Sequence, residues 1–186
     1  KFLKENDATS AMNAIMDTTK ALRLSEKRLF GSESKCNCKL TQLQVLGLLM
    51  LFPCFMIRNA YNYSKSSLSG LFDCRKDVFY RFISNESYDW RKILATVSLQ
   101  LWNKTQGQRA TDSTEPVCLM VDDTDYPKRG IQTELIGKIY SHVTHSMMLG
   151  FKGLFIGITD GISQMLLDFA LVGEEGKNGN YGLKQK

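Results

Sequence analysis

The sequence predicts an α+β protein in which helices occupy residues 1–105 and a β-sheet occupies residues 116–186. Two observations predict this class. Apolar residues in the first region recur three and four positions apart, as on one face of a helix, whereas after Pro116 they form the short continuous runs typical of strands. Residues 106–115 are polar, and we interpret them as a linker. With 43% hydrophobic and 23% charged residues, the composition is that of a globular protein and excludes a disordered tail.

The first predicted helix covers residues 12–22, where apolar side chains follow helical spacing. Ser10 is a candidate N-cap for this helix, and the Gly-Ser-Glu-Ser stretch over residues 31–34 ends the helical segment. A second helix is predicted over residues 40–61, which are apolar on nearly all sides, and Pro53 should kink or divide it. Its apolar run of 13 residues is shorter than the roughly 20 residues that a membrane span needs, so we expect no membrane association.

Residues 66–84 have the pattern of a helix-turn-helix, a motif that binds DNA. A short helix over residues 66–72 is followed by a tight turn and a second helix over residues 75–82, for which Asp73 is a candidate cap. A third helix is predicted to begin at Ser87. It is expected to bury apolar residues at helical spacing, namely Trp90, Ile93, Leu94, Val97 and Leu101.

The charge is unevenly distributed along the chain. Residues 1–110 contain 17 Lys and Arg against 9 Asp and Glu, a formal charge of +8, and residues 111–186 contain 7 against 10, a formal charge of −3. A basic first half predicts a polyanionic partner such as DNA. The alternative is a surface helix with ordinary solvated charges. The residues expected to contact DNA phosphates or bases are Arg75, Lys76, Tyr80 and Arg81.

The second region predicts three strands. Residues 117–121 form a continuous apolar run that is typical of a central strand and ends directly before an acidic cluster. Residues 151–159 predict a second strand. The dipeptide Asp160-Gly161 is a tight-turn signal, and residues 165–172 predict the returning strand of a hairpin.

The acidic cluster contains Asp122, Asp123 and Asp125. Three carboxylates within four positions repel one another unless they are solvated, capped or neutralised by a cation. A divalent cation such as Mg²⁺ is a natural neutraliser, since it uses one or two protein carboxylates and completes its coordination with water and phosphate. The spacing alone leaves a metal site and a solvated turn equally open.

Other potential metal ligands have weaker patterns. Cys36 and Cys38 lack a second Cys or His pair at zinc-site spacing, and His142 and His145 form an H-x-x-H segment that is more simply part of an irregular segment. The chain has five cysteines without the spacing of a disulfide framework, which predicts reduced thiols and a cytoplasmic protein.

The order of motifs after residue 117 resembles the DDE-type transposases of bacterial insertion sequences. The segment VCLMVDDTDYPKRG, followed by GKIYSHVTHSMMLGFKGLFIGITDGISQMLLDFALVG, carries the resemblance, and VFYRFISNESYDWRKIL extends it more weakly to the helical region. Six elements appear in the order of that family: Asp122-Asp123-Thr124, Lys128-Arg129-Gly130, Tyr140-Ser141-His142-Val143, Gly150-Phe151-Lys152, Thr159-Asp160-Gly161 and Asp168-Phe169-Ala170-Leu171.

The resemblance implies an RNase H-like mixed sheet, whose first three strands are antiparallel and follow one another along the chain. It also implies a site for two Mg²⁺ or Mn²⁺ ions that cut DNA by in-line attack at phosphorus. Asp123 matches the first catalytic and metal-binding aspartate, with Asp122 as the alternative, and Lys128 and Arg129 match a basic turn expected at DNA.

The resemblance also implies a second aspartate and a glutamate that no residue after Val172 matches. We therefore expect an N-terminal portion of such an enzyme that is inactive by itself. Its expected partners are the terminal repeats of a transposon in double-stranded DNA, with a homodimer in the synaptic complex, in the bacterial cytoplasm at the nucleoid. The alternatives are a non-catalytic DNA-binding protein, such as a truncated inhibitor of transposition, and a metal-dependent phosphohydrolase unrelated to DNA.

Overall fold

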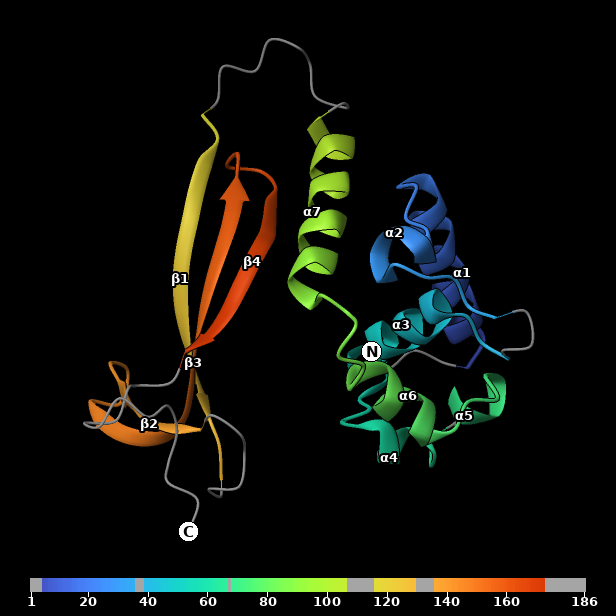
Figure 1. Cartoon of the computed structure of the whole chain (residues 1–186), viewed down its shortest axis with the longest axis horizontal. Coiled ribbons are helices and arrows are strands. Elements are labelled where there is room, and N and C mark those ends of the chain that lie inside the picture. Colours follow the sequence, from blue (N-terminus) through green and yellow to red (C-terminus); the bar gives the residue numbers. More distant parts are fainter. Residues whose placement is uncertain (1–4, 36–38, 67, 107–115, 130–135, 173–186) are drawn as a thin grey trace. The chain divides into compact units, whose positions relative to one another are not determined.

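The computed structural model describes residues 5–35, 39–66, 68–106, 116–129 and 136–172. The chain divides into two compact units, Lys1–Val97 and Ser98–Lys186. The first contains helices and the second contains a four-stranded sheet, so the predicted α+β class is confirmed (Figure 1). The boundary between the units lies within the long helix α7 (Trp90–Gln106), ahead of the predicted linker, and residues 107–115 of that linker lie outside the described residues.

The helical unit is built from short helices that precede α7. They are α1 (Glu5–Ala21), α2 (Glu26–Phe30), α3 (Gln42–Leu51), the 3₁₀ helix η1 (Pro53–Phe55), α4 (Ala60–Tyr63), α5 (Leu68–Leu71) and α6 (Lys76–Ile83). The predicted division at Pro53 is confirmed, because α3 ends before this residue and η1 begins with it.

Two predicted caps are wrong. Ser10 lies inside α1, which begins at Glu5, and so it cannot cap that helix. The N-cap of α6 is Arg75, which makes no side-chain capping hydrogen bond, while the Asp73 carboxylate forms an ion pair with Lys39 instead. This ion pair holds the pKa of Asp73 below its usual range, chiefly through the hydrogen bond from the Lys39 ammonium.

An aromatic cluster forms the core of the helical unit. The rings of Tyr63 and Phe79 are fully buried, their centroids lie 4.8 Å apart, and Phe52 contacts both. The Tyr63 hydroxyl donates a hydrogen bond to the carbonyl of Phe72 at 2.7 Å, and burial raises the pKa of this phenol. Phe82 is also buried, so α6 is anchored through two phenylalanines and its opposite side faces solvent.

A second aromatic cluster surrounds Phe82. Its rings meet edge to face or tilted, with centroids between 4.9 and 5.8 Å apart, in the geometry that aromatic pairs prefer. Its other members are Phe30, Tyr88 and Trp90. Of the five residues of α7 predicted to be buried, Ile93 is buried, whereas Trp90, Leu94, Val97 and Leu101 are partly exposed. The helix begins three residues later than the predicted start at Ser87.

The Glu26 carboxylate connects α2 with the start of α3. It accepts hydrogen bonds from the Ser34 backbone N–H at 2.7 Å, the Ser34 hydroxyl at 3.0 Å and the Leu43 backbone N–H at 3.1 Å. Burial acts to raise the pKa of Glu26, but the hydrogen bonds from Ser34, Leu43 and Gln42 outweigh it and the pKa is lowered. A single side chain thus satisfies N–H groups that the first turn of α3 cannot pair internally.

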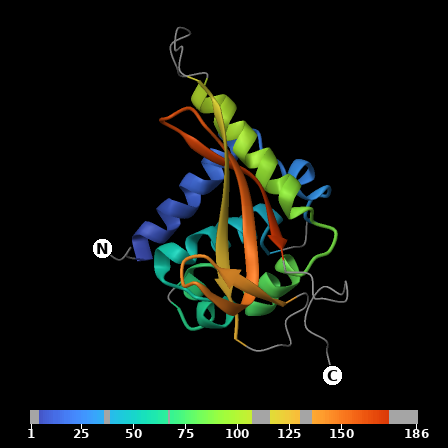
Figure 2. The same ribbon diagram turned by 90° about the vertical axis from the view of Figure 1, so that its left-hand side faces the viewer.

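The sheet contains four antiparallel strands. These are β1 (Cys118–Pro127), β2 (Gly137–Ser141), β3 (Ser146–Thr159) and β4 (Gln164–Val172). The long strand β3 lies between β1 on one edge and β4 on the other (Figures 1 and 2). β2 pairs with the first part of β3, opposite β1, where Gly150 faces both Pro127 and Gly137. A Cβ at Gly150 would overlap the Tyr126 carbonyl oxygen, so this crossing requires glycine.

The predicted hairpin around Asp160-Gly161 is confirmed, with β3 and β4 as its strands. Two sheet predictions are wrong. The sheet has four described strands rather than three, because residues 137–141 alternate buried and exposed positions and pair as β2. The described pairs are all antiparallel, as expected for the first strands of the sheet. The first strand does not end before Asp122 but continues to Pro127.

Replacing Glu26 by Ala is expected to lower the free energy of unfolding by about 1–2 kcal/mol, and Glu26→Gln by about half as much, since the amide keeps an acceptor but loses the charge. Because the folded-state pKa is lowered, this contribution is complete above the ordinary pKa of 4.5 and is lost as the pH falls through the folded-state value. Urea unfolding at pH 7 and at about pH 3 measures it. Equal stability of wild type and Glu26→Ala at pH 7 would contradict the connecting role.

Candidate functional site

The acidic cluster lies inside β1, where it faces the middle of β3. Asp122 pairs with Phe155, Asp123 with Leu154 and Asp125 with Lys152 in the antiparallel register. Charged residues are tolerated here because most positions of β1 are exposed. The cluster is therefore fixed on a regular strand and is not the solvated turn that the sequence left open.

Alternation along β1 separates the two candidate aspartates. Successive side chains of a strand point to opposite faces, so Asp123 and Asp125 share one face and Asp122 lies on the other. Asp122 lines a hollow of about 480 Å³ together with Met120, Phe155 and Gln164. Its carboxylate accepts a hydrogen bond from the Asp123 backbone N–H at 2.9 Å. Of the two candidates, Asp123 therefore shares its face of β1 with another aspartate, Asp125, and Asp122 does not.

Lys152 of β3 lies against this pair. Its Nζ is 3.1 Å from Oδ2 of Asp123 and 3.9 Å from Oδ1 of Asp125. The exposed fractions of the three side chains are 25% for Lys152, 53% for Asp123 and 17% for Asp125. Since the site is partly open to water, each ion pair is worth about 0.2–1 kcal/mol.

The Asp123 face opens into a hollow of about 400 Å³ at the end of the sheet that carries the β2–β3 turn. Ser141, His142 and Thr144 of this turn line it together with both aspartates and Lys152. The predicted H-x-x-H segment thus lies in a β-turn, with His142 and His145 exposed and the His142 ring 5.2 Å from that of Tyr140. Among the described residues, no three His, Cys, Asp or Glu side chains come together as a metal-binding group.

Asp123 and Asp125 fit a single hard cation. Two carboxylates on one face of a rigid strand supply the oxygen ligands that Mg²⁺ and Mn²⁺ take, and water or phosphate can complete the coordination. The ammonium of Lys152 lies at the same two carboxylates. The hollow beside them leaves room for a phosphate group.

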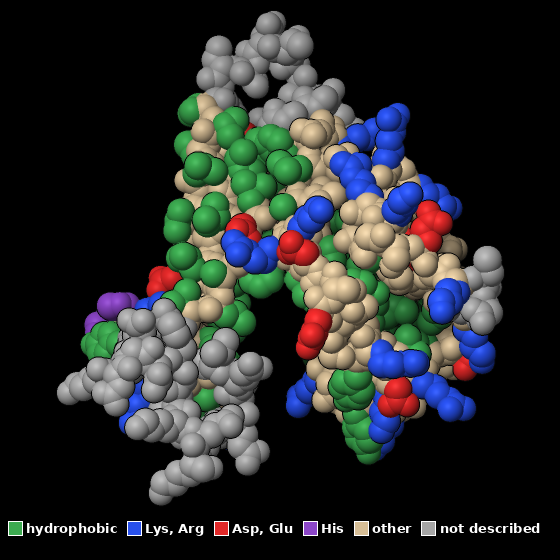
Figure 3. All heavy atoms as spheres, in the orientation of Figure 1, with side chains coloured by type: hydrophobic (Ala, Val, Ile, Leu, Met, Phe, Trp, Pro, Cys, Tyr) green, Lys and Arg blue, Asp and Glu red, His purple; other side chains and the backbone are tan. Residues whose placement is uncertain are grey.

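The residues predicted to contact DNA lie together on the exposed side of α6 and at its N-cap. Arg75, Lys76, Tyr80 and Arg81 are all exposed. Tyr80 is half-exposed, whereas its neighbour Phe79 is fully buried. Figure 3 shows Lys and Arg side chains spread over the helical unit, whereas hydrophobic side chains gather over the strands.

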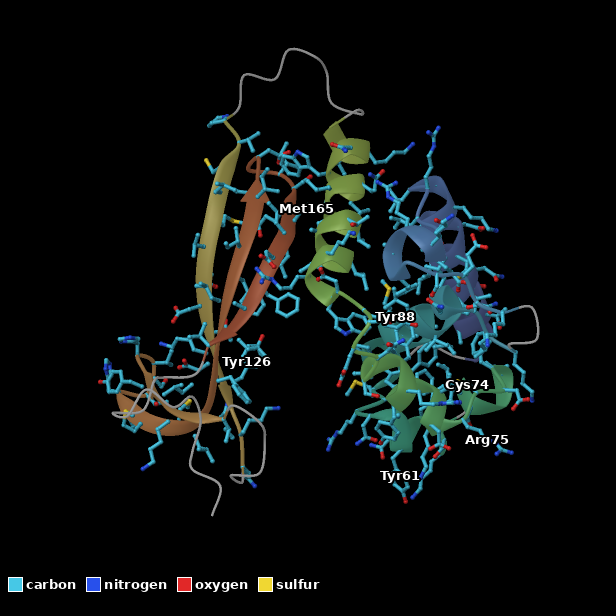
Figure 4. All side chains as sticks on the ribbon, viewed as in Figure 1. Tyr61, Cys74, Arg75, Tyr88, Tyr126 and Met165 are labelled. Carbon is cyan, nitrogen blue, oxygen red and sulfur yellow. The ribbon has the colours of Figure 1, made fainter. Side chains whose placement is uncertain are left out.

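Two residues beside α6, Tyr61 and Lys65, were not predicted from the sequence as functional residues. Tyr61 of α4 is half-exposed, and its ring centroid lies 4.5 Å from the ammonium of Lys65 and 5.7 Å from that of Lys76. Figure 4 shows Tyr61 and Arg75 at the end of the helical unit that contains α4, α5 and α6. The helices that pack most extensively against α6 are α3 and α4. The signal in the sequence was the Arg-x-x-Tyr-x-x-x-Lys spacing over residues 58–65.

Lys128 and Arg129 directly follow β1 and are exposed, and the Lys128 backbone N–H donates to the Leu149 carbonyl at 2.9 Å. Gly130 of the same predicted turn lies outside the described residues. So do Cys36 and Cys38. Cys54, Cys74 and Cys118 are free thiols, and burial together with the nearby Asp73 charge raises the pKa of Cys74 to about 11.

Comparison with known proteins assigns no family to the chain. No protein-family model matches it, and no curated protein or solved structure matches it. In the part of the chain that the structure describes, no helix is both long and apolar enough to cross a membrane.

Asp123→Asn is expected to weaken Mn²⁺ binding to the chain by at least about fivefold, because it removes one of two anionic ligands while keeping the side-chain shape. Asp122→Asn is the matched control, since it removes the same charge one residue away on the other face. Electron paramagnetic resonance of free and bound Mn²⁺ measures the affinity. A larger loss of Mn²⁺ affinity in Asp122→Asn than in Asp123→Asn would show that the cation site lies on the Asp122 face, and would contradict its assignment to Asp123.

Proposed function

We propose that the chain is a portion of a DDE-type transposase of a bacterial insertion sequence, acting in DNA transposition. The observation that carries the proposal is the position of Asp123 on β1, beside Asp125 and opposite β3, which in turn pairs with β4 through a hairpin. The motif resemblance predicts the first aspartate at the end of a strand, and here β1 carries Asp123 and continues to Pro127. A basic helical unit that precedes the sheet supports the same function, because such an enzyme must also hold its DNA.

In this proposal Asp123 holds a divalent cation at the DNA phosphate that is cut. When bound, Mg²⁺ or Mn²⁺ activates the attacking water or 3′ hydroxyl and stabilises the leaving oxygen. The pleat of β1 keeps the Asp123 carboxylate on a fixed face, and Asp125 adds negative charge beside it. The resemblance implies three metal-binding carboxylates, and Asp123 is the one residue of this sequence that matches its motif. Because a single matched carboxylate does not complete the site, we expect no DNA cleavage by this chain alone.

The exposed side of α6 is the proposed DNA-binding surface. Arg75, Lys76 and Arg81 provide the positive charge for phosphates, and Tyr80 provides an aromatic hydroxyl at the same surface. The proposed ligand is the terminal repeat of a transposon in double-stranded DNA, bound by a homodimer when two ends are paired. Lys128 and Arg129, which directly follow β1 in the sheet unit, are separate proposed contacts to DNA. This function places the protein in the bacterial cytoplasm at the nucleoid.

A second candidate is a non-catalytic DNA-binding protein that occupies transposon ends and inhibits transposition. The ion pairs of Lys152 with Asp123 and Asp125 favour it, because they offset one of the two negative charges of the acidic pair without any metal. Both candidates require DNA binding by α6. They differ in whether Asp123 binds a divalent cation.

Changing Arg75, Lys76 and Arg81 together to Ala is expected to flatten the salt dependence of DNA binding. Each neutralised phosphate contributes about 0.9 to the slope of log K against log salt, so the loss of three contacts should reduce it by about two to three units. Fluorescence anisotropy with a labelled duplex measures the slope for the 186-residue chain. Asp123→Asn should leave DNA binding intact.

The matched control changes three lysines elsewhere on the helical unit, Lys20, Lys27 and Lys35, which are exposed like those of α6. This variant loses the same charge but should change the slope by less than about one unit. An equal effect of the two triple variants would remove α6 from the interface. No binding of wild-type chain to duplex DNA at low salt would contradict both candidate functions.

A further inference from the structure

The strand pairing of Lys152 does not by itself determine where its ammonium group lies. It pairs directly with Asp125 across the β1–β3 ladder, yet its ammonium lies nearer to Asp123, two residues along the strand. The side chain is only 25% exposed although an ammonium gains most from full hydration. The negative charge of the acidic pair accounts for this orientation, since Nζ lies within 4 Å of both carboxylates.

The residues around the Lys152 ammonium indicate that it contacts the two aspartates specifically. On its own strand and on the same face, Lys152 is followed by Leu154, which stands opposite Asp123. On β4 it stands opposite Val172. Among the strand neighbours named above, Asp123 and Asp125 are therefore the acidic residues that can pair with Lys152. They are also the two carboxylates that fit a hard divalent cation.

We propose that Lys152 is a positioning residue that holds the Asp123 carboxylate in the metal-free protein and competes with a divalent cation for it. This inference rests on the proposed function, because it takes Asp123 as a metal ligand. An ammonium and a divalent cation repel each other strongly at one carboxylate. Cation binding therefore requires Lys152 to withdraw, and the ion pairs lower the metal affinity of the site. The freed ammonium is then exposed on the face that carries the hollow beside Asp123.

The first test measures Mn²⁺ affinity of the full chain by electron paramagnetic resonance. Lys152→Met keeps the length of the side chain, removes the competing charge and should tighten Mn²⁺ binding by about fivefold. Lys152→Arg keeps the charge and should stay within about twofold of wild type. Lys138→Met is the matched control: it removes the same charge from the exposed side of β2, outside the hollow, and should change the affinity by less than about twofold.

The second test uses the wild-type chain and needs no variant to fold. Amine acylation followed by mass spectrometry should label Lys152 slowly without metal and at least about threefold faster in saturating Mg²⁺, while labelling of Lys138 stays constant. A faster rate is expected because Mg²⁺ takes the carboxylates to which the ammonium is paired.

The outcomes separate this inference from the proposed function. Tighter binding in Lys152→Met alone, with metal-dependent labelling of Lys152, supports the competition. If Asp123→Asn abolishes Mn²⁺ binding but Lys152→Met binds as wild type does and labelling ignores Mg²⁺, the role of Lys152 is overturned while the metal site stands. If neither wild type nor Lys152→Met binds Mn²⁺ through Asp123, the metal site and the role of Lys152 both fail.

Discussion

The alternation of side chains along β1 is the constraint on which the candidate site depends. In a strand the side chains of residues two apart share a face, and the antiparallel ladder with β3 fixes which face that is. A shift of the register by one residue would move Asp123 to the face of Phe155 and bring Asp122 next to Lys152. The buried crossing at Gly150, where β1 and β2 both pair with β3, opposes such a shift, because there is no room there for another side chain.

In the helical unit, the packing of α6 against an aromatic core determines which side chains are exposed. Phe79 and Phe82 bury one side of α6 in the aromatic core, and this leaves Lys76, Tyr80 and Arg81 on the exposed side. The short helices of this unit have few internal hydrogen bonds, so packing and side-chain contacts such as those of Glu26 must hold them. The proposed DNA-binding surface is thus held in place by an apolar core rather than by the charges themselves.

Local patterns in the sequence were sufficient for the α+β class, the division at Pro53 and the β3–β4 hairpin. Each depends on neighbours within a few positions, which propensity and periodicity record. The sequence did not reveal that β1 continues through three aspartates, because that continuation depends on pairing with β3. Nor did it reveal the ion pairs of Lys152 with Asp123 and Asp125, since their partners lie on different strands. Adjacent residues of a strand lie on opposite faces, but only the register shows that Asp123, and not Asp122, shares its face with Lys152.

The central claim is that one face of β1 carries the cation site and that Asp123 is its ligand. Anomalous scattering from crystals of the chain grown with Mn²⁺, measured at the manganese absorption edge, tests it most directly. The account predicts a peak within bonding distance of the Asp123 carboxylate, on the face shared with Asp125, with the Lys152 ammonium moved away from it. A peak at Asp122 on the opposite face, or none at Asp123 in saturating Mn²⁺ with Lys152 still paired, would contradict it.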